Sequence, residues 1–105
     1  MELIITDKAM DDLKGIHDYI RDNFYSLQSA EKTVSELFEA AEKLVEIPYL
    51  GLDAEIRFGR SFLKDDKVRL LIAGKHLIWY IISNNQIVVL RVANQRQDIA
   101  KLILK

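Results

Sequence analysis

The sequence predicts an α+β fold in which an antiparallel helical hairpin packs on one face of a small, mostly antiparallel sheet. Apolar residues recur at three- and four-residue steps in the first half of the chain, which indicates helices. Short runs rich in Val, Ile and aromatic residues follow in the second half, which indicates strands. The expected order is an N-terminal strand, two helices, three strands and a short C-terminal helix. With 105 residues, 50% of them hydrophobic, we expect a single domain over residues 1–105.

Two helices are predicted in the first half. A strand candidate at residues 3–5 precedes the first helix, which Thr6 or Asp7 can cap. The second helix extends from about Ser29 to Glu46, and Pro48 ends it. The apolar face of the first helix carries Ala9, Met10, Leu13, Ile16, Ile20 and Phe24, and that of the second carries Ala30, Val34, Leu37, Ala41 and Leu44. We expect the core to include Leu13, Ile16, Leu37 and Trp79.

The second half predicts a three-stranded meander after a polar, irregular stretch at residues 48–67. The strands cover residues 68–73, 75–83 and 86–93. Gly74 separates the first two strands. The pair Asn84-Asn85 separates the last two, because asparagine tolerates the positive φ of a two-residue hairpin turn.

Placing Ser83 opposite Gln86 sorts the strand side chains onto two faces. One face is entirely apolar, and we expect it under the helices: it carries Leu77, Trp79, Ile81, Val88, Leu90 and Val92. The other face mixes aliphatic and polar groups, namely His76, Ile78, Tyr80, Ile82, Ile87, Val89, Arg91 and Ala93. Because this second face is too apolar to meet only water, we expect another protein or the C-terminal segment with Ile99, Leu102 and Ile103 to cover it.

Charge is distributed unevenly along the chain. The net charge is -1, yet residues 1–55 hold 5 Lys and Arg against 13 Asp and Glu, whereas residues 56–105 hold 10 against 3. A positive second half attracts anionic partners. Five basic residues lie in the irregular stretch and the strand after it: Arg57, Arg60, Lys64, Lys67 and Arg69. They could bind such a partner, or they could simply be solvated residues of an exposed loop.

What the sequence lacks excludes several classes of function. There is no cysteine, so disulfides, thiolate nucleophiles and Cys-ligated zinc are excluded. His17 and His76 lie far apart, and neither a GxxxxGK[ST] nor a GxGxxG motif occurs, so we expect no metal and no cofactor. No apolar run approaches the roughly 18 to 20 residues that cross a bilayer, and the segment from Met1 to Thr6 does not resemble a secretory signal. We therefore expect a cytoplasmic protein with no membrane partner.

Three hydrogen-bonding side chains on one sheet face form a candidate site. His76, Tyr80 and Arg91 fall on the same face in the predicted register, so they could project from one platform. Each also has a structural interpretation. Arg91 can pair with a carboxylate such as Asp98, Tyr80 can fill the strand, and His76 can sit at an exposed strand end.

The order of these elements and the residues at particular positions together resemble the RelE/ParE toxins of type II toxin-antitoxin systems. The residues that carry the resemblance are the Pro48-Tyr49-Leu50-Gly51 turn after the helix pair, Arg69, the run from Gly74 to Tyr80 and the closing IVVLRVANQRQD from Ile87 to Asp98. The resemblance implies a small bacterial toxin that a cognate antitoxin, usually encoded by an adjacent gene, wraps and neutralises. The aliphatic residues left uncovered in the predicted sheet make a homodimer or a toxin-antitoxin hetero-oligomer more plausible than a bare monomer.

The family divides by target, and the sequence favours one branch. RelE-like members cleave mRNA on the ribosome with clustered Arg and Lys and an acid or base near the C-terminus, whereas ParE-like members inhibit DNA gyrase. Here Leu77 stands where mRNA-cleaving members tend to carry Arg, Asn94-Gln95 replaces a basic pair, and the tail from Ile99 to Lys105 holds neither Tyr nor His. The sequence pI of about 6.1 is also low for a ribosome-bound nuclease. A ParE-like gyrase inhibitor that works by binding is therefore expected.

Two alternatives stay open at this point. A nonstandard endoribonuclease acting on mRNA at the ribosome would use Arg91, Arg96, Tyr80 and His76. An inactive relative would only bind its antitoxin. If the protein acts by binding, as a gyrase inhibitor or as an inactive relative, the residues expected to contact the target or the antitoxin are Arg69, Lys75, Tyr80, Arg91, Asn94, Arg96 and Asp98. Asp98 can also order Arg96 or Arg91 through a charge-assisted hydrogen bond.

Overall fold

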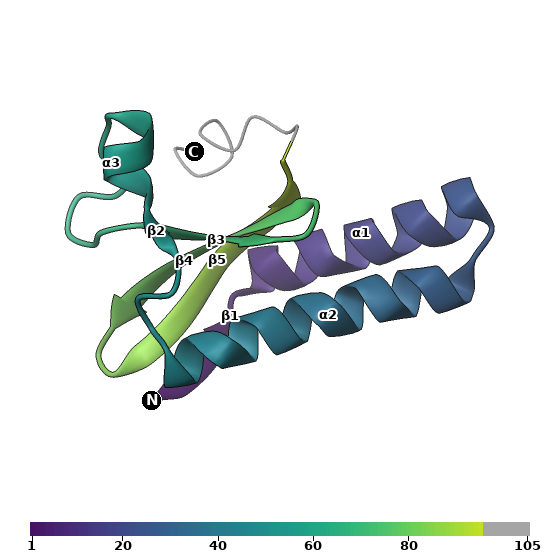
Figure 1. The fold of residues 1–105 in the computed structure, drawn as a ribbon, viewed down its shortest axis with the longest axis horizontal. Coiled ribbons are helices and arrows are strands. Elements are labelled where there is room, and N and C mark those ends of the chain that lie inside the picture. Colours follow the sequence, from purple (N-terminus) through teal and green to yellow (C-terminus); the bar gives the residue numbers. More distant parts are fainter. Residues whose placement is uncertain (96–105) are drawn as a thin grey trace.

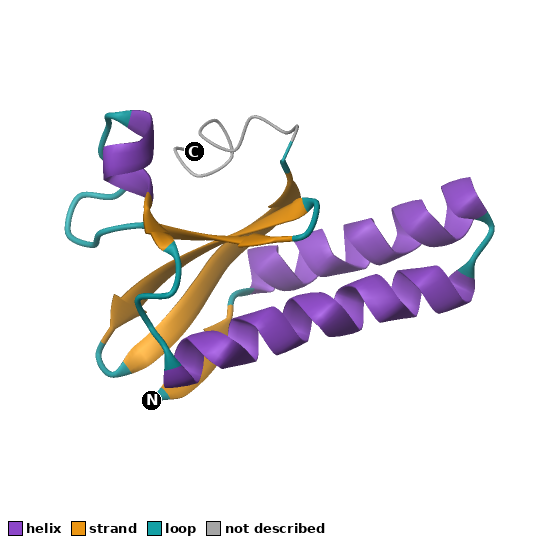
Figure 2. Ribbon diagram, in the orientation of Figure 1, coloured by secondary structure: helices purple, strands orange, loops and turns teal. Residues whose placement is uncertain are grey.

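The computed structural model describes residues 1–95 and has the predicted α+β architecture (Figure 1). Its elements are β1 (Glu2–Ile5), α1 (Asp7–Phe24), α2 (Leu27–Glu46), β2 (Leu52–Asp53), α3 (Ala54–Phe58), β3 (Arg69–Ala73), β4 (His76–Ser83) and β5 (Gln86–Asn94). The helical hairpin of α1 and α2 lies along one side of the sheet, and α3 lies on the other (Figure 2). The expected C-terminal helix lies outside the described residues.

The helical hairpin begins and turns at residues suited to helix ends. The Thr6 hydroxyl caps α1 by accepting the backbone N–H of Ala9 at 3.2 Å, as predicted. Tyr25 ends α1 with a left-handed φ of 52°, and the Ser26 hydroxyl then caps α2 through the N–H of Ser29. This cap starts α2 two residues before the predicted Ser29. No helix within residues 1–95 is long and apolar enough to cross a membrane.

The sheet has five strands in the order β1-β5-β4-β3-β2. β1 pairs with β5 in parallel, while all other neighbours are antiparallel. The turn between β4 and β5 is the predicted one, since Asn84 and Asn85 have φ values of 52° and 60°. The sequence missed β2 and α3, because elements of 2 and 5 residues are too short to show a period.

A bulge changes the pairing of β4 with β5. Ser83 lies opposite Gln86 and Tyr80 opposite Val89, as predicted, but the register then shifts and Trp79 lies opposite Arg91. The extra residue in β5 moves the side chains beyond it to the other face. Val92 accordingly packs among the helices rather than with Trp79.

The expectation for which sheet face lies under the helices was wrong. The hairpin covers the face that carries Ile78 and Val89, which pack with Leu13 and Leu37, and next to them Tyr80 packs with Leu44. The other face, with Leu70, Trp79 and Ile81, is buried by residues 54–68 through Ala54, Phe62 and Val68. Both faces carry mostly apolar residues, so the alternation of side chains does not tell which one receives the helices. Among the expected core residues, Leu13, Leu37 and Trp79 are buried and Ile16 is partly buried against the core.

Aromatic stacking explains how the polar stretch covers the sheet face that carries Trp79. The Phe58 ring stacks on Trp79 at 5.6 Å between centroids, and Phe62 meets Trp79 edge-on at 5.2 Å. The segment between α3 and β3 is therefore anchored by apolar residues placed among charged ones. The C-terminal residues expected to cover the opposite face, which carries Ile78 and Tyr80, lie outside the described part of the chain: Ile99, Leu102 and Ile103.

Candidate functional site

The phenol of Tyr80 closes the turn that follows α2. Tyr80 is fully buried, and its hydroxyl donates to the carbonyl of Pro48 at 2.8 Å. The same hydroxyl accepts the backbone N–H of Gly51 at 3.0 Å. A Cβ atom on Gly51 would lie 2.6 Å from this hydroxyl and 2.7 Å from the carbonyl oxygen of Leu70, so only glycine fits. The Pro-x-x-Gly sequence is thus a turn fitted onto the sheet beneath it.

Arg69 fastens the same turn from the neighbouring strand. Its guanidinium donates to the carbonyl oxygen of Gly51 and, at 3.3 Å, to that of Tyr49. It also lies 5.0 Å from the centre of the Tyr49 ring, a cation–π geometry. Because Arg69 is directly opposite Tyr80 in the sheet, the two side chains form one cluster. Its polar groups are directed at the backbone of the turn.

Arg91 joins the sheet to the first helix. Its Nε and Nη2 atoms donate to the two carboxylate oxygens of Asp12 in α1 at 2.7 and 2.8 Å, and the backbone N–H of Val92 donates to the same carboxylate at 3.0 Å. Both side chains are mostly buried, at 17% and 16% exposed. The hydrogen bonds to Asp12 raise the pKa of Arg91. The carboxylate partner of Arg91 is therefore Asp12, a residue that the sequence reading did not consider for this role.

The remaining described candidates lie at the other end of the sheet. His76 pairs with Ala73 in β3 and with Asn94 in β5, next to the turn that holds Lys75. Burial, and to a smaller extent the charge of Lys75, lowers the pKa of His76. Gln95 closes this end with hydrogen bonds to the carbonyl oxygens of Lys75 at 3.0 Å and Gly74 at 2.8 Å. Lys75 is exposed.

The platform of His76, Tyr80 and Arg91 is not formed. His76 and Tyr80 are four residues apart on β4, about 13 Å at the usual rise per residue, and the Tyr80 phenol is buried under the turn. Within residues 1–95, no group of three or more His, Asp or Glu could hold a metal ion. Arg96 and Asp98 lie outside the described residues.

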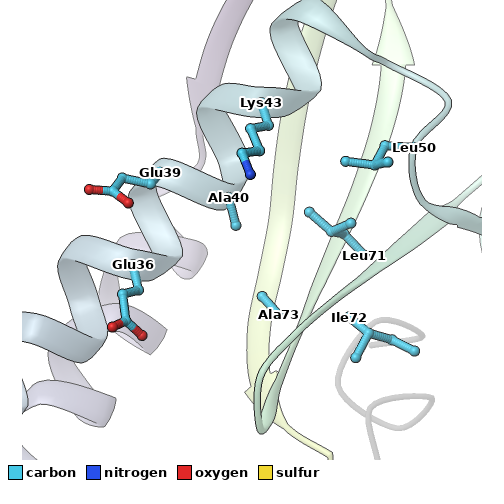
Figure 3. A pocket seen from close by; sticks show the side chains of 8 residues that line it. All are labelled: Glu36, Glu39, Ala40, Lys43, Leu50, Leu71, Ile72 and Ala73. Carbon is cyan, nitrogen blue, oxygen red and sulfur yellow. The ribbon is translucent and has the colours of Figure 1, made fainter.

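Two surface features remain exposed. The first is the distal end of the helical hairpin, which extends past the sheet in Figure 1 and carries the exposed side chains of Tyr19, Phe24, Tyr25 and Leu27. The second is a groove between α2 and β3, drawn in Figure 3. It is lined by Glu36, Glu39, Ala40, Lys43, Leu50, Leu71, Ile72 and Ala73. Both are places where a partner can bury apolar surface.

Comparison with known families identifies the type of protein. The model of the ParE toxin of type II toxin-antitoxin systems, parDE, matches residues 3–99. The chain belongs to the ParE toxin family. This membership confirms the resemblance to RelE/ParE toxins, and within it the ParE-like branch. The matched range includes every described element from β1 to β5 except Glu2, the first residue of β1.

A solved structure supports the fold independently. A chromosomal ParDE TA system from P. aeruginosa contains a chain that matches with a TM-score of 0.71 at 23% sequence identity, covering 90% of this chain and 95% of that one. At this identity the likeness shows the fold. No curated protein matches the sequence closely enough to count as a relative.

The sequence reading missed the residues that form the groove between α2 and β3, and it missed the partner of Arg91. For the partner of Arg91, the signal was the position of Asp12. It directly precedes the buried Leu13 on α1, so its carboxylate lies near the helix face that packs on the sheet. For the groove, the signal was Ile72, a large apolar residue on a strand with no predicted neighbour on its outer side. Neither signal identifies the residues on the other side of the contact. Asp12 and Arg91, like α2 and β3, are far apart in the chain.

Proposed function

We propose that this protein is a toxin that inhibits DNA gyrase by binding it, without a cofactor, and that a cognate antitoxin neutralises it in the cytoplasm. Membership of the ParE toxin family supports the toxin assignment. The choice of gyrase rests on the ParE-like features of the sequence. We further propose that residues 1–105 act as one domain.

The state of Tyr80 is the observation that favours binding over mRNA cleavage. A general acid or base must reach the reacting atom, but the Tyr80 hydroxyl is buried and already engaged by Pro48 and Gly51. Arg91 is likewise held by both oxygens of Asp12. Two of the four groups that a nuclease reading would use, Tyr80 and Arg91, therefore serve the fold.

The exposed basic side chains supply a surface for an anionic partner. Arg57, Arg60, Lys64 and Lys67 are all exposed and belong to α3 and the segment after it. Beside them Ile56 is 80% exposed, which gives a partner apolar area within a positive field. This surface is our candidate for contact with gyrase or its DNA, together with the sequence-predicted Lys75, Asn94, Arg96 and Asp98.

The exposed hairpin end supports association with a further protein chain. Tyr25 is 93% and Phe24 65% exposed, and Phe24 meets Tyr19 edge-on at 6.2 Å. Adjacent exposed aromatic rings are typical of protein interfaces. We propose that the working assembly is a toxin-antitoxin hetero-oligomer or a homodimer.

The test of the target is pulse-labelling of DNA and protein synthesis minutes after the chain is induced in bacteria without antitoxin. We expect DNA synthesis to fall first, and purified toxin to block supercoiling by gyrase. A first fall in protein synthesis, with cleaved mRNA on ribosomes, would instead establish the endoribonuclease. If neither falls, the chain is an inactive antitoxin-binding relative.

Charge reversals locate the target surface. Arg57→Glu with Arg60→Glu should abolish gyrase inhibition while leaving the thermal unfolding temperature unchanged. The matched control is Lys8→Glu with Lys14→Glu, which changes the charge by the same amount on exposed positions of α1. Equal loss in both variants would assign the effect to net charge rather than to the α3 surface.

A further inference from the structure

The chain between β2 and β3 leaves the sheet and returns to it at nearly the same place. The backbone N–H of Ala54 donates to the carbonyl of Val68 at 2.9 Å, and the flanking residues Asp53 and Arg69 pair across the sheet. A compact surface segment whose ends meet in this way has the form of an Ω-loop, a type of loop that is frequently functional. We call residues 55–67 the cover, because they lie over one face of the sheet, on the side away from the helical hairpin (Figure 2).

Beyond α3, side chains alone attach the cover to the sheet. Within residues 1–95, no backbone hydrogen bond joins residues 59–67 to a strand. The attachment is mainly aromatic: the Phe58 ring stacks on Trp79 with the two planes 21° apart, and Phe62 meets both of these rings edge-on. Leu63 adds a partly buried contact. Two phenylalanine rings on one tryptophan therefore hold the cover closed.

The closed cover leaves one polar atom of Trp79 without a partner. The Trp79 side chain is 1% exposed, and its indole Nε1–H donates to no acceptor within residues 1–95. A buried indole N–H usually has a partner. An unpartnered buried donor opposes the closed state, because water would accept its hydrogen bond in the open one. Since the indole lies between the sheet and the rings of Phe58 and Phe62, opening of the cover returns this N–H to water.

Opening would also enlarge an apolar surface that is already partly exposed. Leu70 and Trp79 lie under the cover, and two residues next to Leu70 share its sheet face. These are Leu52, directly opposite it in β2, and Ile72, two positions along β3. Leu52 is 48% and Ile72 56% exposed with the cover closed. The open state joins all four into one apolar surface, which is costly in water, so the closed state is the main one.

We propose that the cover opens from the sheet as one unit, pivoting at Ala54 and Val68, while the five-stranded sheet and the helical hairpin stay folded. The two ends are joined by a backbone hydrogen bond, whereas Phe58 and Phe62 hold the far part through their side chains. A region with few backbone hydrogen bonds to its neighbours opens more easily than the core. Opening therefore requires the loss of the aromatic contacts on Trp79 and of no strand pairing.

The cover also carries much of the proposed target surface, and this second part of the inference rests on the proposed function. Ile56, Arg57 and Arg60 all lie on the cover. Their positions relative to the sheet are fixed only while the cover is closed. Opening removes the arrangement that the target would contact, so Phe58 and Phe62 are positioning residues for this surface. Closure of the cover thus controls how much of the toxin is able to bind.

The first test uses the wild-type full-length protein. Trp79 is the only tryptophan in the chain, so its indole N–H gives a single NMR signal whose hydrogen exchange can be followed at low urea concentrations. We expect its protection factor to be at least about tenfold lower than those of the backbone amides of β4, which is paired on both sides. Its dependence on urea should be weaker, since opening exposes less surface than unfolding. Equal protection with equal urea dependence would overturn the inference.

The second test compares the same substitution on the two faces of the sheet. Phe62→Leu removes one ring from Trp79, whereas Phe38→Leu removes a ring that packs against the core on the helix side. Acrylamide quenching of Trp79 fluorescence should rise in Phe62→Leu and stay at the wild-type value in Phe38→Leu, with the β4 amides protected in both. Quenching that rises equally in the two variants, or in neither, would contradict local opening of the cover.

Gyrase supercoiling assays test the second part and separate it from the function on which it rests. Phe62→Leu should weaken inhibition by the factor by which its closed fraction falls, and Phe38→Leu should inhibit as the wild type does. A wild type that opens its cover but does not inhibit gyrase refutes the proposed function and supports the opening. If the wild type inhibits, and a Phe62→Leu protein with a more open cover inhibits equally well, the role of closure in target binding is refuted.

Discussion

Asp12 and Arg91 are 79 residues apart in the chain, yet two hydrogen bonds of 2.7 and 2.8 Å join them. The same carboxylate accepts the backbone N–H of Val92, the residue after the bulge in β5. One side chain of α1 therefore satisfies both the guanidinium and the backbone where the strand register shifts. This contact fixes the hairpin to the sheet at that point.

Replacing Asp12 by Ala should lower the free energy of unfolding by about 3 kcal/mol, because it leaves a mostly buried guanidinium without its carboxylate partner. Urea unfolding measures the change. Asp11→Ala, at the exposed neighbouring position, is the control and should change stability little. Arg91→Glu would place a second carboxylate beside that of Asp12 and destabilise the protein. A loss of partner binding in that variant therefore counts as a direct effect only if the protein is still folded.

Two glycine-to-alanine changes should act in opposite directions. Gly51→Ala forces a Cβ against the Tyr80 hydroxyl and a backbone carbonyl, which should cost about 2 kcal/mol or more. Gly15→Ala, inside α1 with open space around the new methyl group, should gain up to about 1 kcal/mol of helix stability. Thermal unfolding temperatures of the two variants, compared with the wild type, decide the matter. Equal effects would contradict the tight fit at Gly51.

Tyr80→Phe should destabilise the protein by about 1 to 3 kcal/mol while leaving its toxic activity intact at temperatures where it stays folded. The change leaves the Gly51 N–H and the Pro48 carbonyl without their partner. Denaturant unfolding and the gyrase supercoiling assay measure the two effects separately. Activity lost from a folded Tyr80→Phe protein would point to a chemical role for the phenol.

Stability should fall in acid partly through His76. Because burial lowers the pKa of His76 in the folded protein, the unfolded chain takes up a proton at a higher pH than the folded one. The resulting loss of stability is absent well above the ordinary histidine pKa of 6.5. It grows as the pH falls through 6.5 toward the lower pKa of His76 in the folded protein. His76→Gln should flatten this part of the curve of unfolding temperature against pH. Lys75→Gln should reduce the effect partly, since the charge of Lys75 is its smaller cause.

The sequence predicted the parts of this fold that local patterns determine. The helical period placed α1 and α2, and Asn84-Asn85 set the hairpin turn and the first four pairs of its ladder. The choice of face failed because burial by Phe58 and Phe62 depends on how a polar stretch folds back over Trp79. The hydrogen-bond partners of two predicted site residues could not be predicted for a similar reason. Arg69 and Tyr80 are neighbours, as alternation allows, but their partners are backbone groups of a distant turn.

The parallel pairing of β1 with β5 also sets an order of events during folding. Glu2 to Ile5 find their partners only at Gln86 to Val89, so the first strand made by the ribosome has no neighbour in the sheet until almost all described residues have been synthesised. Pairing of such distant segments is slow, because a long loop must close before any contact forms. A nascent chain interrupted before β5 therefore lacks both the strand that joins β1 to β4 and the anchor for α1. The folded toxin can therefore form only after β5 has been synthesised and can pair with β1.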